Sequence, residues 1–325
     1  MRSTLVILWL AFTFLYPTQS QAIRTSLHFE RFSIEQGLSQ ATAQAILSDK
    51  RGFLWIGTSD GLNRYDGYQV KSFDGPDDIF TSESISTLFL DEQQNLWVST
   101  LYSGLYRVNT ITLSVEQVFN GRLSPDNNII SEVIAIEQGD ENKLWLGISE
   151  HVYSLDKLTG KLTHYLTLNL KDNIVRALLL EGDWLFCATG RGLYRLNVAN
   201  GDSQFISHQT PEFNSEDSDN TKFLLRDKEL GLLMGTVEGL FLLQTTTENG
   251  AEKLTSNLLV ADLNIWDIIL DGNDYLIASN KGLYRLNRDN LRLSPVLKFS
   301  DSRFQITDNT ILDLFLINIW LFAVN

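Results

Sequence analysis

Polar side chains of different chemistry recur at one place in the sequence, directly before a glycine–leucine pair or its equivalent. Two acids, a hydroxyl, an imidazole and two bases at corresponding positions can together contact a polar ligand. Tyr102 and the nearby Asp78 and Phe80 are expected on the same face. The predicted ligand-binding set is Asp60, Tyr102, Ser103, His151, Arg191, Glu238 and Lys281. The alternative interpretation is that surface turns accept any polar residue.

No residue pattern predicts catalysis. The four histidines, His28, His151, His164 and His208, are widely spaced and form no metal-ligand pattern. The sequence has no Gly-x-Ser-x-Gly elbow, phosphate loop or dinucleotide fingerprint. A pair of carboxylates for glycan cleavage stays open among 40 acidic residues, but none is singled out. We therefore predict a protein that is not an enzyme and has no cofactor or metal. A hydrolase or lyase is a further alternative.

A repeated unit must position these side chains. In the first unit, strands are predicted near residues 42–48, 53–58, 62–66 and 69–73, separated by polar or glycine-containing turns. The turn between the second and third strands returns near residues 61, 104, 152, 192, 239 and 282. Glycine there suits a positive φ, so the unit with Val152 is expected to use a different turn.

The spacing of about 40 to 50 residues, with several short strands in each unit, is typical of a β-propeller. We predict an all-β, seven-bladed propeller of four-stranded antiparallel blades over residues 23–325. The seventh unit, 311–325, is incomplete because it stops before a turn glycine and a third strand. Bulky residues recur in the second strand, and Trp55, Trp97, Trp145 and Trp184 are interpreted as packing between blades rather than as ligand contacts.

The N-terminus predicts export. Met1-Arg2, an apolar run over 5–15 and the small-residue site at 20–22 indicate a secretory signal peptide over 1–22 and a periplasmic protein. An uncleaved anchor is the alternative, although the run is short for a membrane span. The net charge of −14 argues against nucleic acid as a partner. The single Cys187, in an apolar strand, is expected to be buried.

The segment 32–40, followed by Trp55-Ile56-Gly57-Thr58 and Gly61-Leu62-Asn63-Arg64-Tyr65-Asp66, resembles the two-component regulator propeller family. The resemblance extends from about residue 29 to residue 320. It implies a periplasmic propeller that senses a ligand, followed in full-length members by a β-sandwich, a membrane helix and a histidine kinase or diguanylate cyclase.

The resemblance gives two functional hypotheses. The first is a ligand-sensing propeller of a two-component or cyclic-di-GMP receptor, truncated before its membrane and output domains, with a small molecule or glycan as ligand. The alternative is a free-standing periplasmic scaffold that holds a protein partner. Stabilisation by a small molecule would favour the first, and a stable copurifying protein the second.

Overall fold

The computed structural model describes residues 34–73, 79–120, 132–168, 174–206, 220–248, 251–297, 313–317 and 320–324. The predicted signal peptide, His28 and His208 lie outside these ranges. Apart from the short 3-10 helix η1 (Ile34–Gln36), the regular structure of the described residues is β-strand. The all-β class predicted from the repeats is confirmed.

Six antiparallel sheets of four strands each follow one another along the described chain. Blade 1 holds β1 (Ala43–Ser48), β2 (Leu54–Thr58), β3 (Gly61–Tyr65) and β4 (Val70–Ser72). Blade 2 holds β5 (Ile85–Leu90), β6 (Asn95–Thr100), β7 (Gly104–Asn109) and β8 (Val115–Phe119). Blade 3 holds β9 (Ala135–Gln138), β10 (Lys143–Ile148), β11 (His151–Asp156) and β12 (Leu162–Thr167).

The second half repeats the pattern. Blade 4 holds β13 (Val175–Glu181), β14 (Trp184–Thr189), β15 (Gly192–Asn197) and β16 (Ser203–Ile206). Blade 5 holds β17 (Thr221–Asp227), β18 (Gly231–Thr236), β19 (Gly239–Glu248) and β20 (Ala251–Ala261). Blade 6 holds β21 (Ile265–Asp271), β22 (Asp274–Ser279), β23 (Gly282–Asn287) and β24 (Leu293–Leu297). A final sheet has two strands, β25 (Asp313–Ile317) and β26 (Trp320–Val324).

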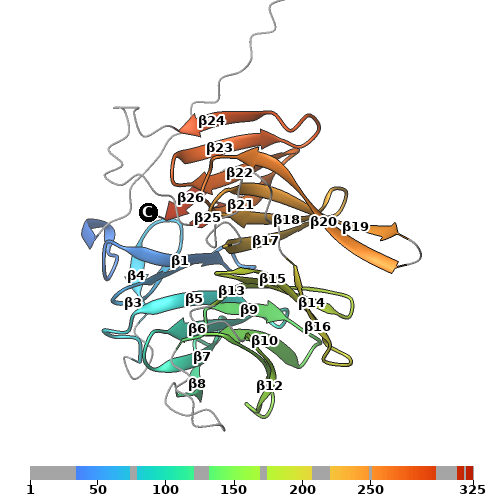
Figure 1. Cartoon of the computed structure of the whole chain (residues 1–325). Coiled ribbons are helices and arrows are strands. Elements are labelled where there is room, and N and C mark those ends of the chain that lie inside the picture. Colours follow the sequence, from blue (N-terminus) through green and yellow to red (C-terminus); the bar gives the residue numbers. More distant parts are fainter. Residues whose placement is uncertain are drawn as a thin grey trace, which may run out of the picture. The chain divides into compact units, whose positions relative to one another are not determined.

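The first strands of the blades surround the propeller axis. Each contacts the first strand of the next blade, from β1 through β5, β9, β13 and β17 to β21, and β25 contacts both β21 and β1. Figure 1 shows these strands in the middle and fourth strands such as β8, β12 and β24 outside. The propeller architecture is therefore confirmed, but the predicted number of blades is corrected. The described residues form six four-stranded blades rather than seven, because the seventh unit contributes only the β25–β26 pair.

The core lies between neighbouring blades. Trp55 packs with Ile85 and Val98 of blade 2, and Trp97 packs with Leu144 and Leu146 of blade 3. Trp145 packs in the same way against blade 4. The interpretation of these three tryptophans as blade packing is confirmed, since each is almost completely buried.

Trp184 does not occupy the equivalent position, which corrects the sequence alignment by two residues. In blade 4 the buried position belongs to Phe186, three residues before Thr189, as Trp55 stands three residues before Thr58. Trp184 is half-buried, and the Arg195 guanidinium lies 4.3 Å from its ring centroid.

Glycine in the second strand lets the next blade approach closely. A Cβ added at Gly57 would stand 2.6 Å from Cγ2 of Ile85, and one at Gly147 would stand 2.6 Å from Cγ1 of Val175. Both distances are far below van der Waals contact, so only glycine allows these first-strand residues to seat against the preceding blade.

Candidate functional site

One end of the propeller carries both the turns between second and third strands and the start of every first strand. In blade 4, Val175 at the start of β13 pairs with Thr189 at the end of β14. In blade 5, Thr221 pairs with Thr236, and the same pairing recurs in blades 1, 2 and 6. The polar turns and the axis-facing strand ends therefore lie at the same end of the molecule, which we call the turn face.

A hydroxyl side chain fixes most of these turns. Thr189 Oγ1 donates to the carbonyl of Gly192 (2.7 Å) and accepts the backbone N–H of Arg191 (3.2 Å). The corresponding pair of bonds is made by Thr58, Thr100, Thr236 and Ser279 in blades 1, 2, 5 and 6. Because the hydroxyl holds the N–H of the residue before the glycine, that residue has a defined backbone position.

The residues expected to bind ligand lie on these turns, one blade apart. Asp60, Arg191 and Lys281 are exposed, and Ser103 and Glu238 are half-buried. Tyr102 is 72 % exposed in a turn one residue longer than the others. We call this set, with His151, the turn ring.

Three ring side chains are held by polar contacts with other parts of the protein. Ser103 Oγ donates to Oε1 of Glu83 (2.5 Å), and Lys281 Nζ donates to the carbonyl of Asp262 (2.6 Å). His151 Nδ1 lies 3.0 Å from Thr167 Oγ1. Ligand binding by the turn ring stays a prediction.

The third turn differs from the expected register by one residue. His151 pairs with Ile148, as Gly61 pairs with Thr58, so His151 itself stands in the glycine position and Glu150 precedes it. Ile148 has no hydroxyl, and the turn instead places Ser149 at φ 50°. The expectation of a different turn in this unit is confirmed.

A second set of polar residues on the turn face was missed from the sequence. In every four-stranded blade except blade 3, the first strand has a register shift one residue after its start, which leaves a bulged residue. The bulged residues are Gln44, Ser86, Arg176, Lys222 and Trp266. A bulge re-aims a side chain and is common beside binding sites. Aligning the repeats on their first strands would have revealed this polar column in otherwise apolar strands.

Three of these residues, on neighbouring blades, form an axial cluster: Arg176, Lys222 and Trp266. Lys222 Nζ lies 3.1 Å from the Trp266 ring centroid and donates to Oδ1 of Asn264 (2.7 Å). Burial lowers the pKa of Lys222 to about 8, and the charge of Arg176 contributes to the lowering. Burial also lowers the pKa of Arg176. Two cations thus lie together in a chain of net charge −14.

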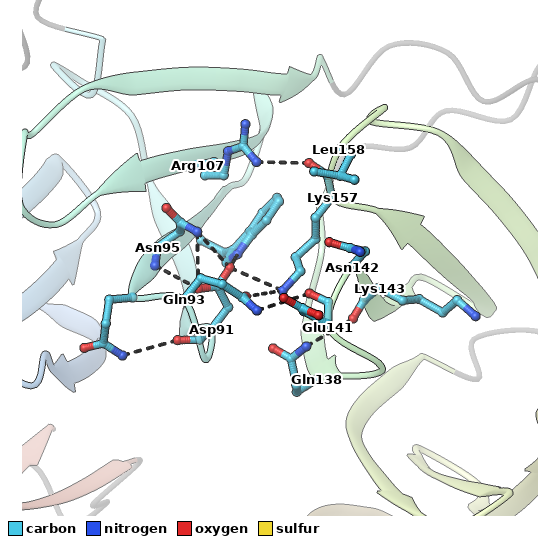
Figure 2. Close-up of polar contacts among 12 residues, drawn as sticks. Asp91, Gln93, Asn95, Arg107, Gln138, Glu141, Asn142, Lys143, Lys157 and Leu158 are labelled. Atoms are coloured by element: carbon cyan, nitrogen blue, oxygen red, sulfur yellow. Dashed lines mark hydrogen bonds and ion pairs between the residues drawn. The ribbon is translucent and has the colours of Figure 1, made fainter.

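The opposite end of the propeller holds blade-to-blade polar contacts, shown for blades 2 and 3 in Figure 2. Asp91 Oδ2 accepts the Trp97 indole N–H (3.0 Å), while Lys157 of blade 3 reaches Gln93 Oε1 (2.5 Å) and lies 3.6 Å from Asp91. Arg107 Nη1 donates to the carbonyl of Lys157 (3.0 Å). The charges neutralise one another, so this network serves to join blades.

The described residues offer few other reactive groups. They contain no gathering of three His, Cys, Asp or Glu side chains suited to a metal ion. Cys187 is fully buried, as expected, and burial raises the pKa of its thiol. No helix in the described part of the chain has the length and apolar character needed to cross a membrane.

Comparison with known proteins agrees with the repeats. The two-component regulator propeller model matches residues 37–60, which confirms the resemblance to that family. The chain is similar to histidine kinase P4 of Formosa agariphila, with 42 % identity over 67 residues, 20 % of this chain and 5 % of the kinase.

Two solved structures from B. thetaiotaomicron share the fold. The extracellular domain assigned to the hybrid two-component system BT4673 matches with 25 % identity and a TM-score of 0.65, over 84 % of this chain and 35 % of that one. The corresponding domain of BT3049 matches with 22 % identity and a TM-score of 0.67, over 88 % and 39 %. The chain therefore spans well under half the length of each of these relatives.

Proposed function

We propose that the propeller is the periplasmic ligand-sensing part of a two-component receptor. The observation that carries this is the shared propeller of two-component regulator repeats, found in the extracellular domains of hybrid two-component systems. The similarity to a histidine kinase favours a kinase as the output module over a diguanylate cyclase. The ligand is a small molecule or glycan that contacts the turn face, where ring residues of both charges are displayed.

This role requires binding rather than chemistry. Each ring residue stands on a turn of a rigid blade, and most of these turns are fixed by a hydroxyl, a setting that preorganises side chains for recognition. The ring would hold the ligand, and a rearrangement at the turn face would be passed to the output module. No bond of the ligand is made or broken.

A gene deletion tests the proposal. A library of sugars and organic acids is first screened for compounds that raise the melting temperature of the purified chain. The transcriptional response to each such compound is then compared in wild-type and deletion strains. We expect the response to disappear on deletion and to return with the intact gene but not with a variant that carries Asp60→Ala, Glu238→Ala and Lys281→Ala. A response that persists in the deletion strain would contradict the sensory role.

The predicted export to the periplasm is tested separately. Residues 1–40 fused to alkaline phosphatase, which is active only after export, should give phosphatase activity in cells. A fusion in which Ile7 and Leu10 are replaced by Arg interrupts the apolar run and should abolish it. Equal activity from both fusions would show that the apolar run does not act as an export signal.

A further inference from the structure

Most of the unpaired buried polar atoms of the described residues lie in or beside the strands of the axial cluster. Among the described residues, five buried side-chain N or O atoms have no hydrogen-bond partner. Three of them are Arg176 Nε, Asn220 Oδ1 and Trp266 Nε1, on or directly before the neighbouring strands β13, β17 and β21. A buried polar atom without a partner is costly, and a ligand that supplied partners to several such atoms would recover that cost.

The chemistry of the cluster is almost entirely that of donors. The Arg176 Nε–H, the Trp266 indole N–H and the Lys222 ammonium all donate, and two of the three carry positive charge. Burial lowers the pKa of both cations, and the charge of Arg176 lowers that of Lys222 further. No described carboxylate forms an ion pair with either side chain. The group that matches several converging donors and a double positive charge is an oxyanion.

The bulges show how the fold builds this arrangement. The register shifts at Val175/Ala177, Thr221/Phe223 and Ile265/Asp267 leave one bulged residue between each pair, in three consecutive blades. The same position in blades 1 and 2 holds Gln44 and Ser86, whose side chains are bonded within the protein. Among the bulged residues, positive charge is therefore confined to the neighbouring strands β13 and β17.

We propose that Arg176, Lys222 and Trp266 bind the carboxylate or sulfate group of a small hydroxylated molecule at the turn face. Arg176 and Lys222 hold the oxyanion, the Trp266 indole N–H adds a third donor, and Asn220 Oδ1 accepts a hydroxyl of the ligand. The inference rests on the proposed sensory function and adds the charge class of its ligand.

Titration calorimetry on the purified chain tests the site. The probes are glucuronate, its neutral counterpart glucose, and inorganic sulfate, at low ionic strength. We expect glucuronate to bind at least tenfold more tightly than glucose. Binding of sulfate as tight as that of glucuronate would assign the site to the free inorganic anion, whereas weaker sulfate binding would assign it to an organic acid. Failure of both anions to bind, or equal binding of glucuronate and glucose, would overturn the inference.

Variants locate the binding. Arg176→Gln and Lys222→Met should each weaken glucuronate at least tenfold, and Trp266→Phe, which keeps an aromatic ring but loses the N–H, should weaken it several-fold. The matched control is Lys161→Gln, which removes one positive charge at an exposed position of the β11–β12 turn, at the other end of the propeller. Circular dichroism melts confirm that each variant is folded. Unchanged affinity in folded Arg176→Gln and Lys222→Met would overturn the site.

The two proposals can fail independently. If glucuronate binds through Arg176 but deletion of the gene changes no transcriptional response, the anion site stands and the sensory role falls. If a ligand response depends on the gene but is fully restored by the Arg176→Gln and Lys222→Met variants, the sensory role stands and the anion site falls.

Discussion

Tyr275 of blade 6 donates its phenolic hydrogen bond to Oδ2 of Asp227 in blade 5, at 2.5 Å. In blades 1 and 2 the corresponding aspartates accept the indole N–H of a tryptophan in their own blade, Trp55 to Asp49 and Trp97 to Asp91. Blade 5 has Leu233 in the tryptophan position, so its aspartate takes a donor from the next blade. Exchange of one core residue has turned a bond within a blade into a bond between blades.

Replacing Tyr275 by Phe should destabilise the propeller. Asp227 keeps its bonds to Arg288 Nη2 (2.7 Å) and to two backbone N–H groups, so the loss is one hydrogen bond to a charged group, about 1.5–3 kcal/mol. Chemical denaturation of the purified chain measures it. Tyr68→Phe, at a side chain that is 97 % exposed, is the matched control and should change nothing. Equal stability of the two variants would refute the role of the phenol.

Asp227 should also make the stability of the protein depend on pH in the acid range. Burial alone would raise the pKa of Asp227, but Arg288, Tyr275 and two backbone N–H groups outweigh it and hold that pKa far below the ordinary value. Because this pKa is lowered in the folded state, the ionised Asp227 stabilises the fold above pH 4, near the pKa of an aspartate in the unfolded chain. This stabilisation is lost as the pH falls below that value. The melting temperature of wild type should therefore drop more steeply below pH 4 than that of Asp227→Asn. Parallel curves would contradict this assignment.

Lys157 should join blades 2 and 3 (Figure 2). Its side chain is 6 % exposed and lies 3.6 Å from Asp91, whose carboxylate is completely buried. Lys157→Met removes one partner of a buried pair, and we expect a loss of about 3 kcal/mol, reduced where Trp97 and Asn95 still satisfy Asp91. The control is Lys161→Met, on the same turn but exposed. Denaturation curves that coincide would show that the network contributes nothing.

The propeller architecture could be predicted from the sequence because every blade repeats the same short-range sequence features. The glycine turns, the Thr or Ser hydroxyl three or four residues before them and the buried bulky position are all short-range features, visible in a single unit. Trp184 was misplaced by two residues because blade 4 carries a second aromatic, Phe186, in the same strand. The turn at His151 was misplaced by one because His151 replaces the turn glycine on which the repeats were aligned.

Alignment of the first strands would have revealed the bulged positions, but not that Arg176, Lys222 and Trp266 meet, because their meeting depends on contacts between blades. Arg176, Lys222 and Trp266 lie more than 40 residues apart in sequence and meet only when β13, β17 and β21 surround the axis. The number of complete blades also depends on distant pairing, since β25 and β26 pair only with each other in the described structure.

Glu137 should destabilise the protein at neutral and alkaline pH. It lies on β9, where blade 3 meets blade 4, and its carboxylate accepts a long hydrogen bond from the Leu180 N–H (3.4 Å). Burial raises the pKa of Glu137 to about 7 from 4.5. Between these values the unfolded chain releases a proton that the folded chain keeps, so stability falls as the pH rises and stays lower above pH 7.

Glu137→Gln should remove this cost. We expect the variant to be more stable than wild type at pH 8.5, by roughly 1–3 kcal/mol, and equally stable at pH 4. Urea denaturation at the two pH values measures the difference. Glu141→Gln, at an exposed position of the neighbouring turn, should give no such pH-dependent gain. A gain that is equal at both pH values would show that charge is not its cause.

Lys222 should couple anion binding to pH. Its pKa of about 8 follows from burial and from the Arg176 charge, while the other close neighbours, Asn264 and Trp266, are neutral. Above pH 8 the free protein loses the ammonium charge, and binding of an oxyanion must restore it. Glucuronate affinity should therefore be nearly constant from pH 6 to 7.5 and fall by up to tenfold per pH unit above about 8. Lys222→Met should bind weakly with no such fall, whereas Lys161→Gln should follow wild type.

In the anion-free protein, Lys222 should make stability rise with pH, whereas it makes anion affinity fall. The unfolded chain keeps the Lys222 proton to higher pH than the folded chain, because the pKa is lowered only in the folded state. Stability should therefore rise between pH 8 and 10 in wild type relative to Lys222→Met. Urea denaturation across this range measures the rise, and calorimetry with glucuronate measures the matching loss of affinity. A wild-type affinity that does not change with pH would place the anion away from Lys222.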